Sequence, residues 1–136
     1  MAATLKLEIV TPEARAYSDD VEMVTLPGVE GEMGVYPQHV PLMTQLVAGE
    51  LIVRKNGQDS YLAVGDGFVE ITGERVAILT DMATAFDQID EVKAEEARKR
   101  AEARLAERID DEETAAVSAA LANATAQLHV KRRRQR

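Results

Sequence analysis

Cysteine and tryptophan are absent from this chain of 136 residues, and only two Phe and three Tyr are present. Without cysteine the chain has no disulfide, no thiolate metal site and no cysteine nucleophile. So few aromatic rings indicate an aliphatic core and argue against a platform for stacking nucleic-acid bases. The remaining composition, 46% hydrophobic and 29% charged, is that of a folded protein of about one domain.

Long apolar runs are also missing. The two longest uncharged stretches, residues 33–49 and 114–130, contain proline or polar residues and fall short of the ~20 apolar residues that cross a bilayer. The first ten residues alternate like a strand and lack the basic and apolar regions of a signal peptide. We therefore expect a cytosolic protein that does not itself insert into a membrane.

Negative charge dominates everywhere except at the C-terminus. The net charge is −8 and the last six residues carry +5, so the other 130 residues carry −13. An acidic body repels phosphate, which excludes nucleic acid as a partner for all but the tail. The tail, residues 131–136, is either a solvated end or an element that binds nucleic acid, anionic lipid or an acidic protein.

Residues 1–86 have the pattern of β structure. Leu5, Leu7 and Ile9 alternate with charged residues, and a second run over residues 21–26 is closed by Pro27-Gly28. Asn56-Gly57 between two alternating runs predicts a tight hairpin, because both turn residues must adopt positive φ. Frequent turns between short runs predict a β-sandwich or flattened barrel of about ten strands.

Residues 87–136 contain no glycine or proline and have the composition of helices. We expect one helix over residues 91–108 and a second whose N-cap and acidic first turn are supplied by residues 110–113. The apolar stripes are mostly alanine: Ala94, Ala97, Ala101, Leu105 and Ile109 on the first helix, and Val117, Leu121, Ala124 and Leu128 on the second. The chain is thus α+β, with a helical hairpin that buries little apolar area and is able to detach.

No active site can be assembled from these residues. His39 and His129 lie in different halves and match no metal-binding spacing. Gly28, Gly31 and Gly34 resemble a glycine loop, but no Gly-Lys-Ser/Thr follows to grip phosphate. We expect no catalytic residue, no metal and no cofactor, and hence a binding or mechanical subunit.

Residues 28–44, GVEGEMGVYPQHVPLMT, carry a specific pattern of glycine, proline and histidine. This pattern predicts a stiff, non-repetitive loop between strands. The segment resembles the epsilon subunits of F-type proton-translocating ATP synthases. Residues 64–70, VGDGFVE, and the helix around residues 94–105 agree in order and spacing, so the resemblance extends from Leu5 to about Val130.

The resemblance implies one copy of a rotor subunit in a hetero-oligomeric complex, in which the β domain joins the γ subunit to the ring of c subunits. It implies a peripheral position on the cytoplasmic face of a bacterial plasma membrane, or on the stromal face of the thylakoid. The residues expected to contact these partners are Glu32, Tyr36, His39, Pro41 and Thr44. His39 is equally suited to a purely structural role.

For the hairpin, the resemblance implies a regulatory arm that permits turnover when folded and blocks ATP hydrolysis when extended along γ. In the extended state its basic residues would meet an acidic segment of a catalytic β subunit. The candidates on the first helix are Arg98, Lys99, Arg100, Arg104 and Arg108. The alternative for these charges is a solvated face with weak surface ion pairs.

Some relatives bind ATP through an [IL]-D-x-x-R-A sequence and arginines on the second helix. Here the corresponding residues are Ile89, Asp90 and Lys93, followed by Asn123 and Gln127 where arginines are expected. Lysine lacks the planar fork of arginine, and the two amides carry no charge for phosphate. We predict weak or absent ATP binding, with Asp90 as a helix N-cap.

Two other functions fit parts of the sequence. One is a β-sandwich adaptor that binds proteins through its hairpin outside any rotary enzyme. The other is a nucleic-acid binder that works through residues 131–136, which predicts strongly salt-dependent binding. Neither accounts for residues 28–44.

Overall fold

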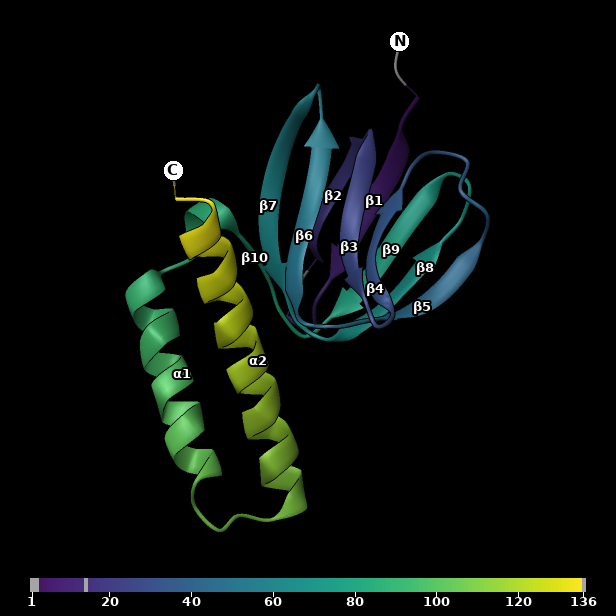
Figure 1. Cartoon of the computed structure of the whole chain (residues 1–136). Helices are drawn as coiled ribbons and strands as arrows, with labels where there is room; N and C mark the ends of the chain where they lie inside the picture. Colours follow the sequence, from purple (N-terminus) through teal and green to yellow (C-terminus); the bar gives the residue numbers. More distant parts are fainter. Residues whose placement is uncertain (1–2, 14, 136) are drawn as a thin grey trace.

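The computed structural model describes residues 3–13 and 15–135. Over these residues the chain forms ten β-strands, a short 3-10 helix and two α-helices (Figure 1). The α+β prediction is therefore confirmed. The elements are β1 Leu5–Val10, β2 Arg15–Val21, β3 Met23–Gly28, β4 Gly31–Val35, β5 Leu42–Leu46, β6 Gly49–Lys55, β7 Gln58–Val64, β8 Gly67–Ile71, β9 Arg75–Thr80, β10 Ala83–Ala85, η1 Phe86–Gln88, α1 Glu91–Leu105 and α2 Asp111–Arg133.

The strands form one sheet in the order β10-β7-β6-β3-β5-β8-β9-β1-β2, with β4 paired to β3 beside this path. The pairing of β1 with β9 is parallel, whereas the other pairings among the described residues are antiparallel. The sheet curls so far that β2 comes into contact with β6. Its two halves thus face each other as a flattened sandwich (Figure 1).

Alternating side chains fill the space between the halves. Leu5, Leu7 and Ile9 are all buried, as predicted from the alternation in β1. The core is aliphatic, and its largest fully buried members also include Leu26, Leu46, Leu51, Ile71 and Ile78. All its buried residues lie between Leu5 and Ile78, so the sandwich has a core independent of the helices.

Local turn chemistry is confirmed at the β6–β7 hairpin. Asn56 and Gly57 have φ of 54° and 74°, the positive values that a two-residue type I′ turn requires. The predicted strand over residues 21–26 is wrong in its bounds. Val21 ends β2 and β3 begins at Met23, because the chain bends at Glu22 between two strands that lie next to each other in the sequence.

The prediction of a non-repetitive loop over residues 28–44 is largely wrong. β4 pairs with β3 and β5 pairs with β8 within this segment, which leaves only the turn after β3 and residues 36–41 outside strands. Gly34 lies within β4, paired with Thr25 of β3, so it does not form the bend that the sequence predicts. A Cβ at Gly34 would come within 2.9 Å of the flexible end of the Met23 side chain.

The helices form an antiparallel hairpin with the predicted caps. Asp90 accepts from the Lys93 amide at the start of α1, and Asp110 accepts from the Glu113 amide at the start of α2. α1 ends at Leu105, three residues earlier than the predicted end at residue 108. No helix in the described part of the chain is long and apolar enough to cross a membrane.

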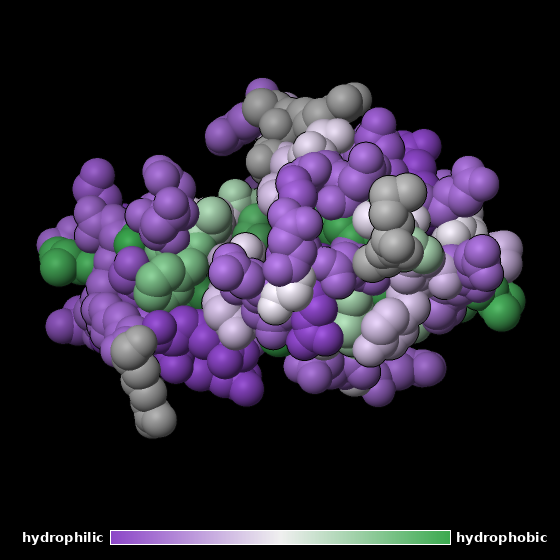
Figure 2. All heavy atoms as spheres, turned by 90° about the horizontal axis from the view of Figure 1, so that it is seen from above, coloured by the Kyte–Doolittle hydropathy of each residue, from purple (hydrophilic) through white to green (hydrophobic). Residues whose placement is uncertain are grey.

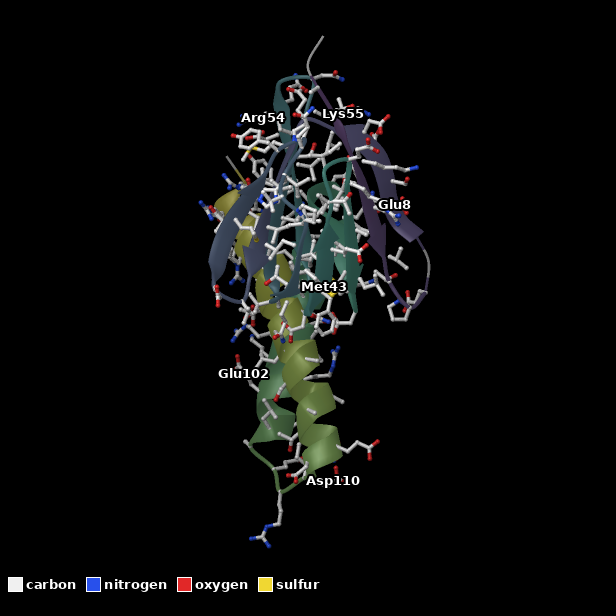
Figure 3. All side chains as sticks on the ribbon, turned by 90° about the vertical axis from the view of Figure 1, so that its right-hand side faces the viewer. Glu8, Met43, Arg54, Lys55, Glu102 and Asp110 are labelled. Atoms are coloured by element: carbon white, nitrogen blue, oxygen red, sulfur yellow. The ribbon has the colours of Figure 1, made fainter. Side chains whose placement is uncertain are left out.

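α2 lies between α1 and the sandwich, where it contacts β6 and β7. The turn between the helices projects beyond the sandwich (Figure 1), and Asp110 lies at the opposite end of the molecule from Arg54 and Lys55 (Figure 3). The hairpin is therefore docked along one side of the sheet through the C-terminal half of α2. The end of the hairpin that contains the turn between the helices extends beyond the sandwich.

Candidate partner-binding surface and docked hairpin

The residues predicted to contact partners lie along β4, the following loop and β5. Glu32, Tyr36 and Pro41 are exposed, whereas His39 and Thr44 are half-buried. Thr44 lies opposite the buried Val69 of β8. The structure thus places these five residues along one stretch of chain without assembling them into a single cluster.

The loop over residues 36–41 is held to the sandwich by its backbone. Gln38 has a φ of 67°, and its amide donates to the carbonyl of Gly73 in the β8–β9 turn at 2.6 Å. The Nδ1 of His39 lies 2.6 Å from the carbonyl oxygen of Val40, to which it donates. The first bond ties the loop to the β8–β9 turn, whereas the second lies within the loop itself.

An exposed apolar surface, which sequence reasoning missed, adjoins this segment. Met43, Phe68 and Leu79 are 67%, 61% and 60% exposed, and they lie on the adjoining strands β5, β8 and β9. We call these three residues the outer patch. Phe68 and Leu79 are neighbours in register, and a hollow of about 370 Å³ beside Leu79 is lined by Val10 and Pro12, among others.

A signal for the outer patch was available in the alternation. Val69 and Ile71, like Val76 and Ile78, occupy the inward phase of their strands, so Phe68 and Leu79 must point outward. Figure 2 shows that the surface seen from above is mainly hydrophilic. Large apolar side chains on adjoining strands of a soluble domain typically mark an interaction site.

The hairpin docks on the outer side of β6 and β7 through a second, smaller apolar cluster. Its buried members are Ala63, Ile89, Ala126 and Val130, packed with Ala48, Tyr61, Met82 and Phe86. One turn closer to the N-terminus of α2, the Nδ2 of Asn123 donates to the Oδ2 of Asp81 at 3.4 Å. Of the predicted stripe on α2, Ala124 and Leu128 are buried, whereas Val117 and Leu121 are half-buried.

The basic tail does not form a solvated end over residues 131–135. α2 continues to Arg133, and Arg134 donates two hydrogen bonds to Glu50 of β6, at 2.8 and 3.0 Å. The Arg134 guanidinium also lies 4.0 Å from the centroid of the Tyr61 ring. The hydrogen bond to Glu50 raises the pKa of Arg134. Arg136 lies outside the described residues.

Two of the five basic residues predicted on the first helix are paired inside the hairpin. Arg98 binds Glu95 and Glu102, and Arg104 binds Glu107 and Glu113. Lys99, Arg100 and Arg108 are exposed and make no ion pair with the residues that the structure describes. Two of the five positive charges are thus neutralised by carboxylates of the hairpin itself.

Carboxylates at the start of α1 are also paired. The hydrogen bond from Arg98 lowers the pKa of Glu95 to about 2, with further contributions from the charges of Arg98 and Arg132. Arg132 and Gln135 lower the pKa of Glu91 through hydrogen bonds. Both carboxyl groups are therefore ionised at neutral pH and bind the tail.

Two of the residues considered for nucleotide binding have structural roles. Ile89 is buried in the apolar cluster, and Asp90 caps α1. Lys93 is exposed, and Gln127 is half-buried on α2. No group of three or more His, Asp or Glu within residues 3–13 and 15–135 is placed to hold a metal ion.

The comparisons with known proteins agree along the chain. Residues 4–86 match the family model described as ATP synthase, Delta/Epsilon chain, beta-sandwich domain, and residues 87–132 match ATP synthase, Delta/Epsilon chain, long alpha-helix domain. An ATP synthase epsilon chain of Laribacter hongkongensis is 44% identical over 93% of this chain and 91% of its own length. One of Herpetosiphon aurantiacus is 45% identical over 96% of both chains.

Solved structures agree with these matches. A chain of the Euglena gracilis mitochondrial ATP synthase, in a structure described as OSCP/F1/c-ring, superposes with a TM-score of 0.72 at 25% identity, over 90% of this chain and 78% of that one. A chain of the Tetrahymena thermophila mitochondrial enzyme superposes with a TM-score of 0.56 at 13% identity, over 93% and 97%, which shows the shared fold alone.

Proposed function

Because the chain belongs to the delta/epsilon chain family of ATP synthases, we propose that it is a non-catalytic subunit of the central stalk. One copy joins the γ subunit to the ring of c subunits, so that rotation driven by proton flow reaches the catalytic head. The match to a chain from an assembly of F1 and c-ring supports this position. The subunit would lie peripherally on the cytoplasmic face of a bacterial plasma membrane, or on the stromal face of the thylakoid.

The observation that carries this proposal is the outer patch beside residues 36–44. Exposure of three large apolar side chains on adjoining strands to water is unfavourable, and a partner that covers them lowers the free energy. Glu32, Tyr36, His39, Pro41 and Thr44 lie along the neighbouring stretch of chain, and in this proposal they supply further polar and packing contacts with the partners, separate from the patch.

The hairpin is the proposed regulatory arm, captured here in its docked position. In an extended position, Arg98, Lys99, Arg100, Arg104 and Arg108 would face an acidic segment of a catalytic β subunit and slow ATP hydrolysis. Multiple contacts between arginine and carboxylate favour one geometry over diffuse attraction. Lys99, Arg100 and Arg108 are available for this at once, whereas Arg98 and Arg104 must exchange partners.

The test uses a matching α/β/γ head from which this subunit has been removed. The full chain and a truncation ending at Asp87 should both bind the head, since the sandwich has its own core, and only the full chain should slow ATP hydrolysis. Failure of both to bind would refute the central-stalk proposal and favour an unrelated adaptor. Binding of both without inhibition would refute the regulatory arm alone.

The outer patch is tested with a single substitution and a matched control. Phe68→Ser removes the centre of the patch and should weaken binding to the head about 10-fold or more. Val92→Ser removes an equally exposed apolar side chain from α1, away from the patch, and should leave binding unchanged. Equal effects of the two substitutions would contradict the proposal that the outer patch binds the head.

A further inference from the structure

The apolar contact between the hairpin and the sandwich is small for an arm of its length. Its buried side chains are two alanines, one isoleucine and one valine. Alanine buries little area, and each Å² contributes only about 25 cal/mol. Since the turn end of the hairpin projects beyond the sandwich (Figures 1 and 3), the docked position needs contacts of another kind.

Such contacts gather at the last turn of α2. The carboxylate of Glu50 receives both hydrogen bonds from Arg134, and the Nη1 of Arg133 lies 3.5 Å from its Oε1. The Glu50 side chain is only 7% exposed, and that of Arg134 is 23% exposed. A bidentate pair between partly buried groups is stronger and more specific than a surface ion pair.

Two further contacts reinforce this pair. The Tyr61 ring of β7 lies beneath the Arg134 guanidinium. The Nζ of Lys131 donates to the carbonyl of Phe86 at 3.1 Å and lies 4.2 Å from the centroid of its ring. η1, which contains Phe86, contacts β7, so these contacts join the end of α2 to the side of the sandwich.

Arg132 faces α1, whereas its neighbours Arg133 and Arg134 face the sandwich. It binds Glu91 at 3.0 Å and Glu95 at 3.3 Å, both in α1. Those pairs lie inside the hairpin and survive if it detaches as a unit. The contacts of Arg133 and Arg134 with Glu50 exist only while the hairpin is docked.

We propose that Arg133 and Arg134 form an electrostatic latch with Glu50 of β6 as its receptor, and that this latch, reinforced by the contacts of Lys131 with Phe86, holds the hairpin against the sandwich. A latch of this kind releases when salt screens the pair, or when the carboxylates of an acidic protein surface compete for the same arginines. The contacts of Glu50 therefore set the ratio of docked to undocked hairpin. This inference deepens the regulatory arm proposed above, but the latch acts in the isolated chain and is tested there.

Because the chain has no cysteine, the docked fraction can be measured by pulsed electron paramagnetic resonance with two introduced labels. Ser18→Cys in β2 and Ala120→Cys in α2 are exposed positions away from the latch. In this background Glu50→Gln should lower the ratio of docked to undocked chains roughly 10-fold at low salt. It should also remove most of the decrease that high salt causes in the unsubstituted chain.

Matched controls separate the latch from a general charge effect. Glu70→Gln makes the same charge change at an exposed position of β8 and should leave the ratio unchanged. Arg134→Gln should act like Glu50→Gln, whereas Arg132→Gln should not. Amide spectra of β1 and β9 verify that the sandwich stays folded in each variant. Equal docked fractions in the Glu50, Glu70, Arg132 and Arg134 variants would overturn the proposal, even if the full chain inhibits ATP hydrolysis.

Discussion

Asn123 of α2 and Asp81, which follows β9, join the hairpin to the sheet through one hydrogen bond of 3.4 Å across 42 residues of sequence. The Nδ2 of Asn123 donates to the Oδ2 of Asp81, while its own Oδ1 is buried and has no hydrogen-bond partner among the described residues. The contact depends on an amide, because a carboxylate at the same place would have no hydrogen to donate.

Asn123→Asp should therefore undock the hairpin at neutral pH. The substitution replaces a hydrogen bond by repulsion between two carboxylates. Repulsion between two partly solvated charges costs about 1 kcal/mol, which lowers the ratio of docked to undocked chains about fivefold. The same pair of labels at Ser18 and Ala120 measures the change. Gln127→Glu adds an equal charge one turn later in α2 and should have little effect; similar undocking in both variants would show that net charge alone is responsible.

Gly65 and Gly67 should respond differently to a methyl group. A Cβ at Gly65 would lie 1.8 Å from the Oδ1 of Asp81 and 2.5 Å from the Oδ1 of Asn123, so these side chains must move and the hairpin loses its contact. A Cβ at Gly67 would lie 1.8 Å from the Leu79 carbonyl oxygen, which is backbone and cannot rotate away. Gly65→Ala should undock the hairpin, whereas Gly67→Ala should destabilise the sandwich by about 1–3 kcal/mol or more.

Urea unfolding followed by circular dichroism, together with the distance measurement, checks both glycine substitutions. Gly73→Ala is the control, since its Cβ would come no closer than 3.8 Å to Gln38. A Gly67→Ala chain as stable as the Gly73→Ala chain would show that β8 and β9 separate at little cost, against the tight register seen here.

Features that depend on neighbours in the sequence were predictable. The turn at Asn56-Gly57, the alternation in β1 and the caps at Asp90 and Asp110 each follow from the chemistry of a few consecutive residues. The parallel pairing of β1 with β9 joins residues about 70 apart and leaves no local signal. Helix ends were also uncertain, because the polar residues after Leu105 suit both helix and turn.

The binding surfaces were less predictable than the fold. Glu50 precedes a strongly apolar run, and nothing in its neighbours indicates that Arg134, 84 residues later, covers it. The outer patch was hidden for a related reason. Alternation gives the outward direction of Phe68 and Leu79, but both are ordinary residues for a strand, and only the pairing of β8 with β5 places them beside Met43.

Glu95 should titrate well below the usual pKa of a glutamate carboxyl. The Arg98 guanidinium lowers its pKa from 4.5 to about 2, with smaller contributions from other cations that include Arg132. Carbon-detected NMR of the side-chain carboxyl should show this, and Arg98→Gln should raise the pKa of Glu95 more than Arg132→Gln does. A Glu95 that titrates near 4.5 in the unsubstituted chain would contradict the pairing.

The lowered pKa of Glu95 also fixes the pH range in which the hairpin weakens. A carboxyl whose pKa is lower in the folded state stabilises that state fully above its unfolded pKa, and loses this contribution as pH falls. Helix content should therefore hold down to about pH 4.5 and decline between there and about pH 2. In Arg98→Gln the contribution of Glu95 should be reduced to that of its remaining cations, so the decline should be smaller in this range.

Adenine nucleotide should not bind the hairpin tightly. The carboxylate of Asp90 already accepts the Lys93 amide at 3.1 Å, Asn123 is held by Asp81, and Glu91 and Glu95 present negative charge at the start of α1. The guanidinium groups nearest these carboxylates, those of Arg98 and Arg132, already bind them, so phosphate groups would have to displace Glu91 and Glu95. Calorimetric titration with Mg-ATP should give no saturating heat at micromolar concentrations, and the amide resonances of α1 should not shift. Saturation in that range would show that Lys93 suffices as a phosphate ligand despite the neutral side chains of Asn123 and Gln127.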